Sequence, residues 1–469
     1  MRFPAYARWL ILLAATATAA CVAPAQGDTW WTLRAGQDIW REHRVSLVDR
    51  YSYTAYGHRW PDHEWLWQAL AYALHRLGGM PLLTLVVGLL AGASLALSTL
   101  AGPVRRTDLV VLLLAVPGVI GSWTVRPQVL SMALAALALW LLRTRRWWWC
   151  VPLMLVWANA HGGVVFGGLA LGSACVAALW HERRLRPALP LLAVTALSAL
   201  ATLVTPLGTG LWHYVLTSGS RPFEQHITEW RPAYAHLTFF TAVFWAWAAG
   251  TVALVVVRRR RLARWETKLG LVSTAALLPL AIDATRNMTM FVVAATPLLI
   301  QLLRADRPRE RPGDAGDTVG LARPILGAAA AVAALVTAAV YLAAPAGLGW
   351  HPMSATIRQA VRACPGHVYT SYDSGAYLIW FTPDVRVFAD NRQDPYPERI
   401  LDLSILDSSS RWRAAFDQYD VSCAALVSAN RGTIATLRSA GWVTAASDSG
   451  WVVLADPGEA PRSALISGP

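Results

Sequence analysis

The chain has 469 residues, of which 55% are hydrophobic and 15% are charged, and its formal net charge is +13. A soluble globular chain has about 25% charged residues, so this composition excludes an ordinary soluble protein and favours a membrane protein. The charge pattern also argues against nucleic-acid binding, because residues 346–469 carry 10 arginines against 12 acidic residues and the basic excess lies in short loops between apolar runs.

Apolar runs recur through residues 1–345, and crossing a bilayer takes about 20 residues. A small-residue stretch at Val22–Ala25 makes a cleaved signal peptide one interpretation of the first run, but the many runs that follow favour an uncleaved span. About eleven spans are predicted, at 8–25, 80–103, 107–124, 127–142, 147–160, 163–180, 187–205, 237–257, 267–283, 287–303 and 324–344.

Short basic clusters separate these runs, and threading the runs in order places every cluster on one side. The clusters are Arg105-Arg106, then Arg143 with Arg145 and Arg146, Arg183 with Arg184 and Arg186, Arg258–Arg261 with Arg264, and Arg304 with Arg307, Arg309 and Arg311. Basic residues mark cytoplasmic loops, so we predict a multi-pass protein of the inner (plasma) membrane with a cytoplasmic N-terminus. The same loops favour contact with anionic membrane lipids.

Two long loops are predicted on the outer side, at 26–79 and 206–236. In the first, residues 29–41 and 62–77 have helical spacing, and we expect both to lie along the membrane surface as amphipathic helices. An alternative makes 64–77 part of a span, but the segment is short and Gly78-Gly79 should stop it.

The composition changes after residue 345. Short apolar runs alternate with helical stretches, which is typical of a small α/β domain; the runs are 368–369, 385–388 and 423–427, and the helical stretches are 354–363, 396–406 and 431–440. We therefore predict an all-α polytopic membrane domain over 1–345 and an exterior α/β domain over 346–469. Cys364 and Cys423 either form a disulfide there or remain buried thiols.

Ionisable residues of the membrane part collect on the outer face. Asp28 follows the first span, where it either deprotonates an acceptor hydroxyl or caps the helix at 29–41. Asp62 is explained by capping, whereas Glu64 and His63 could add a second carboxylate and a metal ligand. No dedicated metal cage is matched, so the metal is unknown.

Two arginines and a carboxylate lie at other outer turns. Arg126 could anchor a phosphate or pair with a carboxylate, or its side chain snorkels to the interface. Arg286 either contacts a phosphate or forms a local salt bridge with Asp283. Glu229, beside Trp230, either contacts a sugar or forms a rim salt bridge with Arg231 or Arg221.

Two further outer segments carry polar groups that a ligand could reach. His161 and Asn159 lie in a glycine-rich hairpin, where backbone can approach a ligand closely. The cluster Asp390–Asp394 either contacts an acceptor or is a loop that ends a strand.

Taken together, these features resemble the GT-C superfamily of membrane glycosyltransferases, which includes protein O-mannosyltransferases, aminoarabinose transferases and oligosaccharyltransferase catalytic subunits. The chain is more closely similar to a group of bacterial multi-span proteins called glycosyltransferase-like. Five stretches carry this similarity: Asp28–Gly36, His63–Leu66, Arg126–Gln128, Trp157–Gly163 and Glu229–Pro232.

The resemblance implies transfer of a sugar from a polyprenyl-phosphate donor to an envelope glycan, lipid or protein acceptor. It maps the catalytic acid to Asp28. Many members have two adjacent acids there, where this chain has Asp28-Thr29, so Glu64 is the candidate for the second place. Arg126 or Arg286 would neutralise the departing lipid phosphate. No cofactor is certain, and a divalent metal ion stays open.

Two other functions are compatible with the sequence. One is a non-catalytic membrane protein, either a transporter or a polysaccharide assembly factor. The other is an O-antigen-ligase-like enzyme that uses arginines and a histidine without an acidic base. The glycosyltransferase hypothesis needs the outer-face side chains to meet in one pocket.

Overall fold

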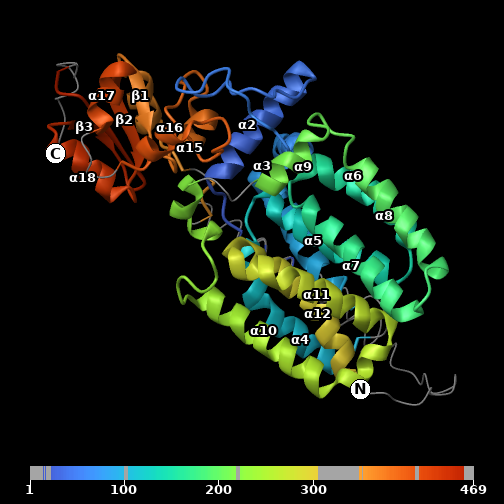
Figure 1. The fold of residues 1–469 in the computed structure, drawn as a ribbon. Coiled ribbons are helices and arrows are strands. Elements are labelled where there is room, and N and C mark those ends of the chain that lie inside the picture. The colour runs from blue at the N-terminus through green and yellow to red at the C-terminus, as the bar shows by residue number, and fades with distance from the viewer. Residues whose placement is uncertain are drawn as a thin grey trace. The chain divides into compact units, whose positions relative to one another are not determined.

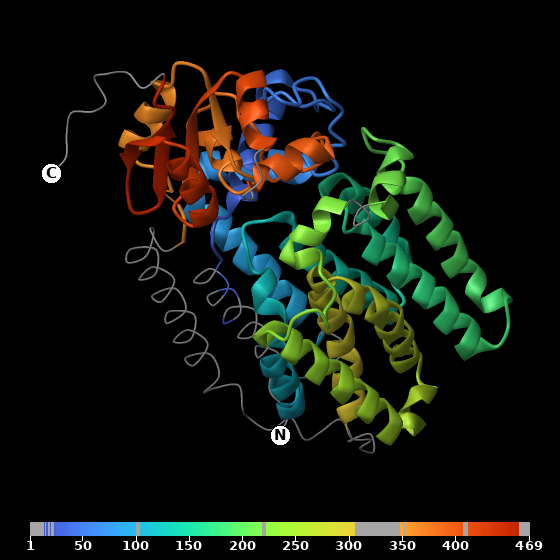
Figure 2. The ribbon, with the colours of Figure 1, turned by 60° about the vertical axis from the view of Figure 1, so that its left-hand side comes forward.

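A computed structural model of the chain describes residues 23–99, 104–217, 222–304, 348–350, 352–406 and 411–458, together with Ala14, Thr16 and Ala19 (Figures 1 and 2). The predicted span 324–344 lies outside these residues, as does most of 8–25. The chain divides into two compact units. The helical unit comprises Met1–Pro24, Gly78–Ser220 and Glu224–Ala344, and the mixed unit comprises Ala25–Leu77, Arg221–Phe223 and Pro345–Pro469.

The helical unit is a bundle in which α12 packs against α4, α5, α10 and α11, and α7 packs against α5, α8 and α11 (Figure 1). Its helices are the second part of α3 (Trp65–Ala96), α4 (Arg106–Val119), α5 (Pro127–Arg143), α6 (Cys150–Ala160), α7 (Val164–Glu182), α8 (Leu189–Ala201), α9 (Gly210–Thr217), α10 (Phe239–Val257), α11 (Trp265–Asp283) and α12 (Met288–Leu303).

Within the described residues, four helical segments are long and apolar enough to cross a membrane: Trp65–Ala96, Val164–Glu182, Phe239–Val257 and Thr285–Leu303. The segments Pro127–Arg143 and Arg186–Ala201 are apolar but shorter. The helical unit is therefore that of an integral membrane protein, and within the described residues four of its segments are clear span candidates.

Basic side chains of the predicted cytoplasmic loops satisfy carbonyl groups at helix ends. Arg143 reaches the carbonyl oxygen of Ser98 at 3.4 Å, and Arg261 Nη1 donates to the carbonyl oxygen of Leu302 at 2.8 Å. Arg304 forms an ion pair of 2.8 Å with the fully buried Asp108. The last carbonyls of a helix have no intrahelical partner. Arg143 and Arg261 therefore stabilise helix ends.

The helix α3 is interrupted where the two units divide. Gly78 and Gly79 have non-helical backbone, and Gly79 has φ +65° and ψ −162°, a conformation that favours glycine. The break falls at the two glycines that were predicted to stop the helix at 62–77. Residues 65–77 belong to the mixed unit.

The mixed unit contains a four-stranded mixed sheet in the order β1-β2-β4-β3, with β1 and β2 parallel and the other pairs antiparallel. The strands are β1 (His367–Thr370), β2 (Val421–Val427), β3 (Val443–Ser447) and β4 (Trp451–Ala455). The helices are α2 (Gly27–Glu42), the first part of α3, α14 (Ala355–Arg362), α15 (Gly375–Phe381), α16 (Glu398–Ser404), α17 (Arg411–Gln418) and α18 (Arg431–Ser439).

The apolar run 385–388 does not form the strand that the sequence predicted. Val387 makes isolated bridges to both Ser52 and Val368. The run thus contacts two different partners and pairs along neither. Its bridge to Ser52 joins the segment before α3 to the C-terminal part of the chain.

Residues 25–77 pack with the C-terminal segment, an association that no sequence pattern predicted. Trp31 and Trp60 share a core with Ile357 and Val368. The helix α2 also packs closely on α3, because a Cβ at Gly36 would lie 2.1 Å from the carbonyl oxygen of Gln68. This explains why a glycine ends the Asp28–Gly36 stretch.

Cysteines divide between the units. Cys364 and Cys423 form a disulfide that links the segment after α14 to β2, which settles the alternative left open by the sequence. Cys150 and Cys175 are buried free thiols in helices of the helical unit.

Candidate functional site

In the helical unit, Arg126 and Glu229 form a two-point ion pair although 103 positions separate them. Arg126 directly precedes α5, where Pro127 takes the first helical position. Glu229 lies on the 3-10 turn Thr228–Trp230 (η5). The Nη1–Oε2 distance is 3.2 Å and the Nη2–Oε1 distance is 3.5 Å. This is the fork geometry in which a guanidinium binds a carboxylate or a phosphate.

A second arginine, Arg286, is held close to this ion pair by hydrogen bonds from the Thr285 side chain to backbone carbonyls. Thr285 Oγ1 donates to the carbonyl oxygens of Thr228 and Glu229 at 3.2 and 3.1 Å, which ties η5 to the 3-10 turn Thr285–Asn287 (η7). The Arg286 guanidinium then lies 4.2 Å from the ring centroid of Trp230. A cation over an indole face is attracted by the ring quadrupole.

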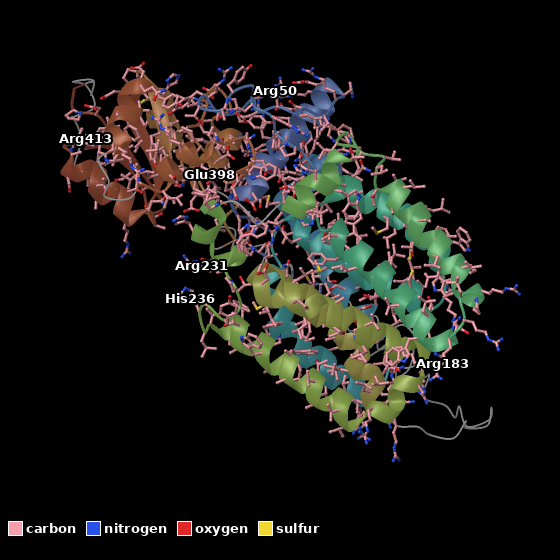
Figure 3. The ribbon with its side chains drawn as sticks, in the orientation of Figure 1. Arg50, Arg183, Arg231, His236, Glu398 and Arg413 are labelled. Carbon is pink, nitrogen blue, oxygen red and sulfur yellow. A yellow bond between two sulfur atoms is a disulfide. The ribbon has the colours of Figure 1, made fainter. Side chains whose placement is uncertain are left out.

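Two of the local pairings that the sequence left open do not occur within the described residues. Asp283 is exposed and forms no ion pair with Arg286, because Arg286 lies over Trp230. Glu229 pairs with Arg126 and not with its neighbour Arg231, whose Nη1 lies 3.2 Å from Nε2 of His236 (Figure 3). The remaining alternative, Arg221, lies outside the described residues.

The charges around Glu229 keep it ionised. Burial raises the pKa of the Glu229 carboxyl, but the charges of Arg126 and Arg286 and the hydrogen bond from Arg126 outweigh this effect and lower the pKa to about 2. His161 adds a smaller influence in the same direction. The cluster is therefore a carboxylate held by surplus positive charge.

A chain of hydrogen bonds orients His161. Trp157 Nε1 donates to Ser131 Oγ at 2.8 Å, and Ser131 Oγ lies 2.7 Å from His161 Nδ1. The backbone N–H of Gly163 also donates to Nδ1, at 3.2 Å. Since Nδ1 accepts these bonds, the neutral ring carries its proton on Nε2.

Asn159 uses its amide donors on backbone. Its Nδ2 donates to the carbonyl oxygens of Leu155 and Val204, both at 2.9 Å. These bonds join the end of α6 to the segment after α8. The observed contacts of Asn159 hold the hairpin in place, and its predicted role in substrate binding stays a prediction.

In the mixed unit, Asp28 is held by a residue from the C-terminal segment. Gln26 is the N-cap of α2 and forms a capping box with Thr29, so Asp28 lies in the first helical turn and is not the cap. Asn391 Nδ2 donates to Asp28 Oδ1. A helix N-terminus also favours a carboxylate electrostatically. The Asp390–Asp394 cluster in the sequence therefore contains the partner that orients Asp28.

A buried charge cluster lies beside Asn391, and sequence reasoning missed it. Arg392 Nη2 lies 2.7 Å from a carboxylate oxygen of Asp49 and 2.7 Å from one of Asp390, and all three side chains are fully buried. The Arg392 guanidinium is 4.9 Å from the ring centroids of Tyr51 and Trp60. Asp49 is an isolated charge in the sequence, so no local signal predicts this pairing.

Glu64 and His63 contact each other at the start of α3. His63 Nε2 lies 3.4 Å from Glu64 Oε1, and His63 Nδ1 lies 3.1 Å from the carbonyl oxygen of Pro61. Burial lowers the pKa of His63, but the hydrogen bond and charge of Glu64 and the charge of Asp394 outweigh it and raise the pKa to about 9. Burial raises the pKa of Asp62 to about 7 against the influence of His63.

In the part of the chain that the structure describes, no group of three or more histidine, cysteine, aspartate or glutamate side chains is arranged to hold a metal ion. Glu64 raises the pKa of His63, and the two side chains form an ion pair. The role of His63 as a metal ligand stays a prediction.

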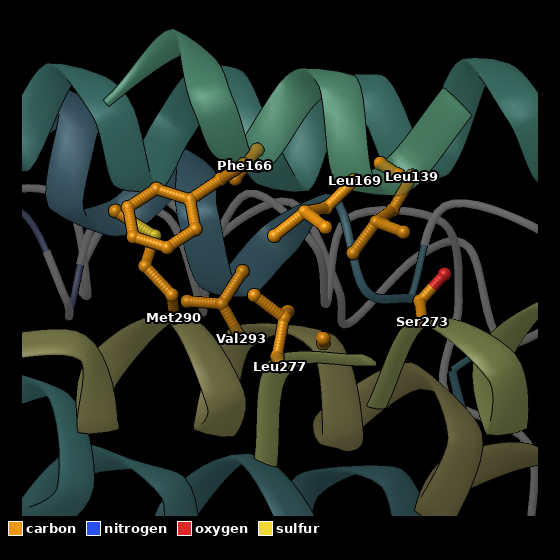
Figure 4. Close-up of a pocket in the computed structure, with 10 residues that line it drawn as sticks. Leu139, Phe166, Leu169, Ser273, Leu277, Met290 and Val293 are labelled. Carbon is orange, nitrogen blue, oxygen red and sulfur yellow. The ribbon is translucent and has the colours of Figure 1, made fainter. Parts of the chain in front are cut away.

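An apolar cavity lies between helices of the helical unit (Figure 4). Phe166 and Leu169 of α7 face Leu277 of α11 and Met290 and Val293 of α12 across it. Its volume is about 10 Å³. That is roughly the space that one water molecule needs, so the cavity as it stands does not hold a lipid chain.

Comparisons with known proteins identify a fold. No protein-family model and no curated protein matches the chain. Among solved structures, ArnT from Cupriavidus metallidurans in the apo state matches with a TM-score of 0.52 at 13% identity, over 96% of this chain and 98% of that chain. The chain therefore shares the fold of ArnT over nearly its whole length.

Two further structures are similar at lower scores. ArnT from the same organism bound to undecaprenyl phosphate matches with a TM-score of 0.49 at 15% identity, over 96% of this chain and 98% of that chain. The archaeal oligosaccharyltransferase AglB from Archaeoglobus fulgidus, in complex with an inhibitory peptide and a dolichol-phosphate, matches with a TM-score of 0.43 at 9% identity, over 90% of this chain and 69% of that chain.

Proposed function

We propose that this chain is an integral membrane glycosyltransferase that moves a sugar from a polyprenyl-phosphate donor to an envelope acceptor. The observation that carries the proposal is the fold shared with apo ArnT over 96% of the chain. ArnT has also been solved with undecaprenyl phosphate, and a polyprenyl phosphate is the donor carrier proposed for this chain.

We assign the role of general base to Asp28. Its carboxylate would accept the proton of an acceptor hydroxyl as the oxygen attacks the anomeric carbon of the donor sugar. The hydrogen bond from Asn391 supports this assignment, because it fixes the direction of the carboxylate. Glu64 is the candidate for a second acidic position, and it lies in ion-pair contact with His63.

We assign contact with the donor phosphate to Arg126 and Arg286. When the bond between the sugar and the phosphate oxygen breaks, the polyprenyl phosphate leaves with the electron pair and gains negative charge. Guanidinium groups already in place would stabilise that charge. The surplus positive charge around Glu229 supports this role. His161 and Asn159 would shape the surrounding hairpin, and Glu229 would contribute to substrate binding.

The test is a transfer assay on purified full-length protein in nanodiscs, using polyprenyl-phosphate-linked sugars labelled in the sugar. Asp28→Asn should reduce release and transfer of the label by about 10²- to 10⁴-fold, the usual contribution of a general base. Asp384→Asn is the matched control, because Asp384 is an exposed aspartate of the mixed unit that pairs only with exposed Arg362 in the described residues. If Asp28→Asn transfers sugar as fast as the native protein, Asp28 is not the general base, and a ligase-like enzyme is favoured.

We further propose that the protein is in the plasma membrane, with its N-terminus in the cytoplasm and residues 346–469 outside. The Cys364–Cys423 disulfide supports this orientation, because such bonds persist in oxidising compartments. The arginine clusters support it independently. Reporter fusions after Pro457 should be active only if the reporter works outside the cytoplasm, and the opposite result would reverse the topology.

A further inference from the structure

The cluster around Glu229 has one more positive charge than its ion pair needs. Arg126 already makes both contacts with the Glu229 carboxylate. Arg286 adds a second guanidinium, and within the described residues it forms no ion pair of its own. A partly buried guanidinium is stabilised by an anion within reach, and the Trp230 ring supplies only part of that stabilisation for Arg286. This surplus suggests that the site is built for an anion larger than one carboxylate.

We propose that Glu229 is the resident anion of a phosphate site. Its carboxylate takes the place that a phosphate group occupies between Arg126 and Arg286, and it turns away when the phosphate binds. Carboxylate and phosphate both accept two parallel hydrogen bonds from a guanidinium, so they compete for the same fork. The inference rests on the proposed function only for the identity of the phosphate as a lipid carrier.

The geometry allows such an exchange with little movement of backbone. The Glu229 side chain is 33% exposed, so it can rotate toward solvent. The carbonyl oxygens of Thr228 and Glu229 stay bonded to Thr285, which keeps Trp230 and Arg286 in place. Trp230 Nε1 has no hydrogen-bond partner in the described part of the chain, so the ring beneath Arg286 offers a further donor.

The exchange is competition between anions and does not depend on protonation. The pKa of Glu229 lies near 2, so the carboxylate is ionised at every physiological pH. Removing its charge should therefore increase phosphate affinity, which is the opposite of what a residue that helps to bind phosphate would show.

The experiment is isothermal titration of full-length protein in phosphatidylcholine nanodiscs with two probes, inorganic phosphate and geranyl phosphate. Glu229→Gln should bind both probes about five- to tenfold more tightly, the size expected from losing one partly exposed arginine–carboxylate competitor. Glu229→Asp keeps the charge and should stay close to the native affinity. Arg286→Met should weaken both probes about tenfold.

Asp283→Asn is the matched control, because it removes the same charge from an exposed side chain three positions from Arg286. Its effect should stay below about twofold, since exposed charges are screened. If Glu229→Gln binds geranyl phosphate more tightly but inorganic phosphate no more tightly, the inference is still supported, and the isoprenoid chain is needed for binding.

Two results would overturn the inference: phosphate binding in a folded Glu229→Gln that is unchanged or weaker than in the native protein, or phosphate binding in Glu229→Asp that is as tight as in Glu229→Gln. Failure of the proposed function is a separate outcome. If Glu229→Gln binds phosphate more tightly while the native protein transfers no sugar from any polyprenyl phosphate, the resident anion stands and the enzyme assignment is lost. If the native protein transfers sugar but Glu229→Gln binds phosphate no more tightly, the enzyme assignment stands and the resident anion is lost.

Discussion

The two units each contain an arginine–carboxylate cluster, and the two clusters are built in opposite ways. In the mixed unit one guanidinium, Arg392, lies between two carboxylates, Asp49 and Asp390, and all three are fully buried. In the helical unit two guanidiniums surround one carboxylate, Glu229, and the ion pair is 21% and 33% exposed. Both occur where distant parts of the chain meet.

Under the function proposed above, this difference separates a structural role from a functional one. A fully buried ion cluster cannot release a partner without leaving an uncompensated charge, so it fixes one arrangement. A partly exposed cluster with surplus charge can exchange its anion at low cost. We therefore expect charge ratio and exposure, rather than the presence of an ion pair, to indicate which arginines act on a ligand.

The largest expected effect comes from removing one arginine from each of the two clusters. Arg392→Met should lower the free energy of unfolding by about 3–5 kcal/mol, because Asp49 and Asp390 would remain buried without a cation. Arg286→Met should change it by about 1 kcal/mol or less, because it loses the contact with the Trp230 ring but leaves no fully buried carboxylate unpaired, while weakening phosphate binding. Thermal unfolding of both variants in detergent measures this, and equal losses of stability would erase the distinction.

The disulfide should rank second. Cys364→Ser removes a bond that closes a loop of 59 positions within the mixed unit, and losing such a bond costs about 2–4 kcal/mol. Cys150→Ser, at a buried free thiol of the helical unit, is the control for the substitution itself. Hydrogen exchange should show faster opening of β2 in the first variant only. Equal protection of β2 in both would mean that the mixed unit does not depend on its covalent link.

Close packing of α2 on α3 should come next. Gly36→Ala places a methyl group against the carbonyl oxygen of Gln68 and should cost about 1–3 kcal/mol through overpacking. Gly432→Ala in α18 meets nothing within 4 Å and should be neutral or slightly stabilising. Chemical denaturation of both variants checks this. If Gly36→Ala leaves the free energy of unfolding unchanged, α2 and α3 can move apart without loss of stability.

The smallest effect is a pH dependence in the mixed unit. Because its pKa in the folded protein is raised to about 9, His63 contributes stability that is complete below about pH 6.5 and is lost as the pH rises through about 9. Between pH 7.5 and 10, the native protein should lose on the order of 1 kcal/mol more than His63→Gln. Asp62, with a pKa near 7, is largely ionised across this window. Parallel stability curves would contradict the His63–Glu64 pairing.

Much of the fold could be predicted because it depends on local patterns. Apolar length and arginine position predicted a polytopic helical part, and alternation of short runs predicted a small α/β segment. The helix boundary at Gly78-Gly79 was also readable, since glycine tolerates the backbone that breaks the helix. What could not be read was the packing of 25–77 with the C-terminal segment, because contacts such as Ser52 with Val387 join positions with no shared local pattern.

The candidate site divides in the same way. Residue type and position identified Arg126, Glu229 and Arg286 individually, and the structure brings these three together. Their mutual pairing, and the choice of Asn391 as the partner of Asp28, depend on tertiary structure. The alternative in which Asp28 caps its own helix was reasonable from sequence, but Gln26 takes that position.

The arginines at the ends of the membrane helices have a consequence for engineering the protein. Experiments that invert a membrane protein by moving basic residues assume that those residues act only during insertion. Here Arg143 and Arg261 also bind carbonyl groups of neighbouring helices. Relocating them would therefore unravel helix ends in the finished protein, so a failed inversion would report damage to the bundle rather than the strength of the insertion signal.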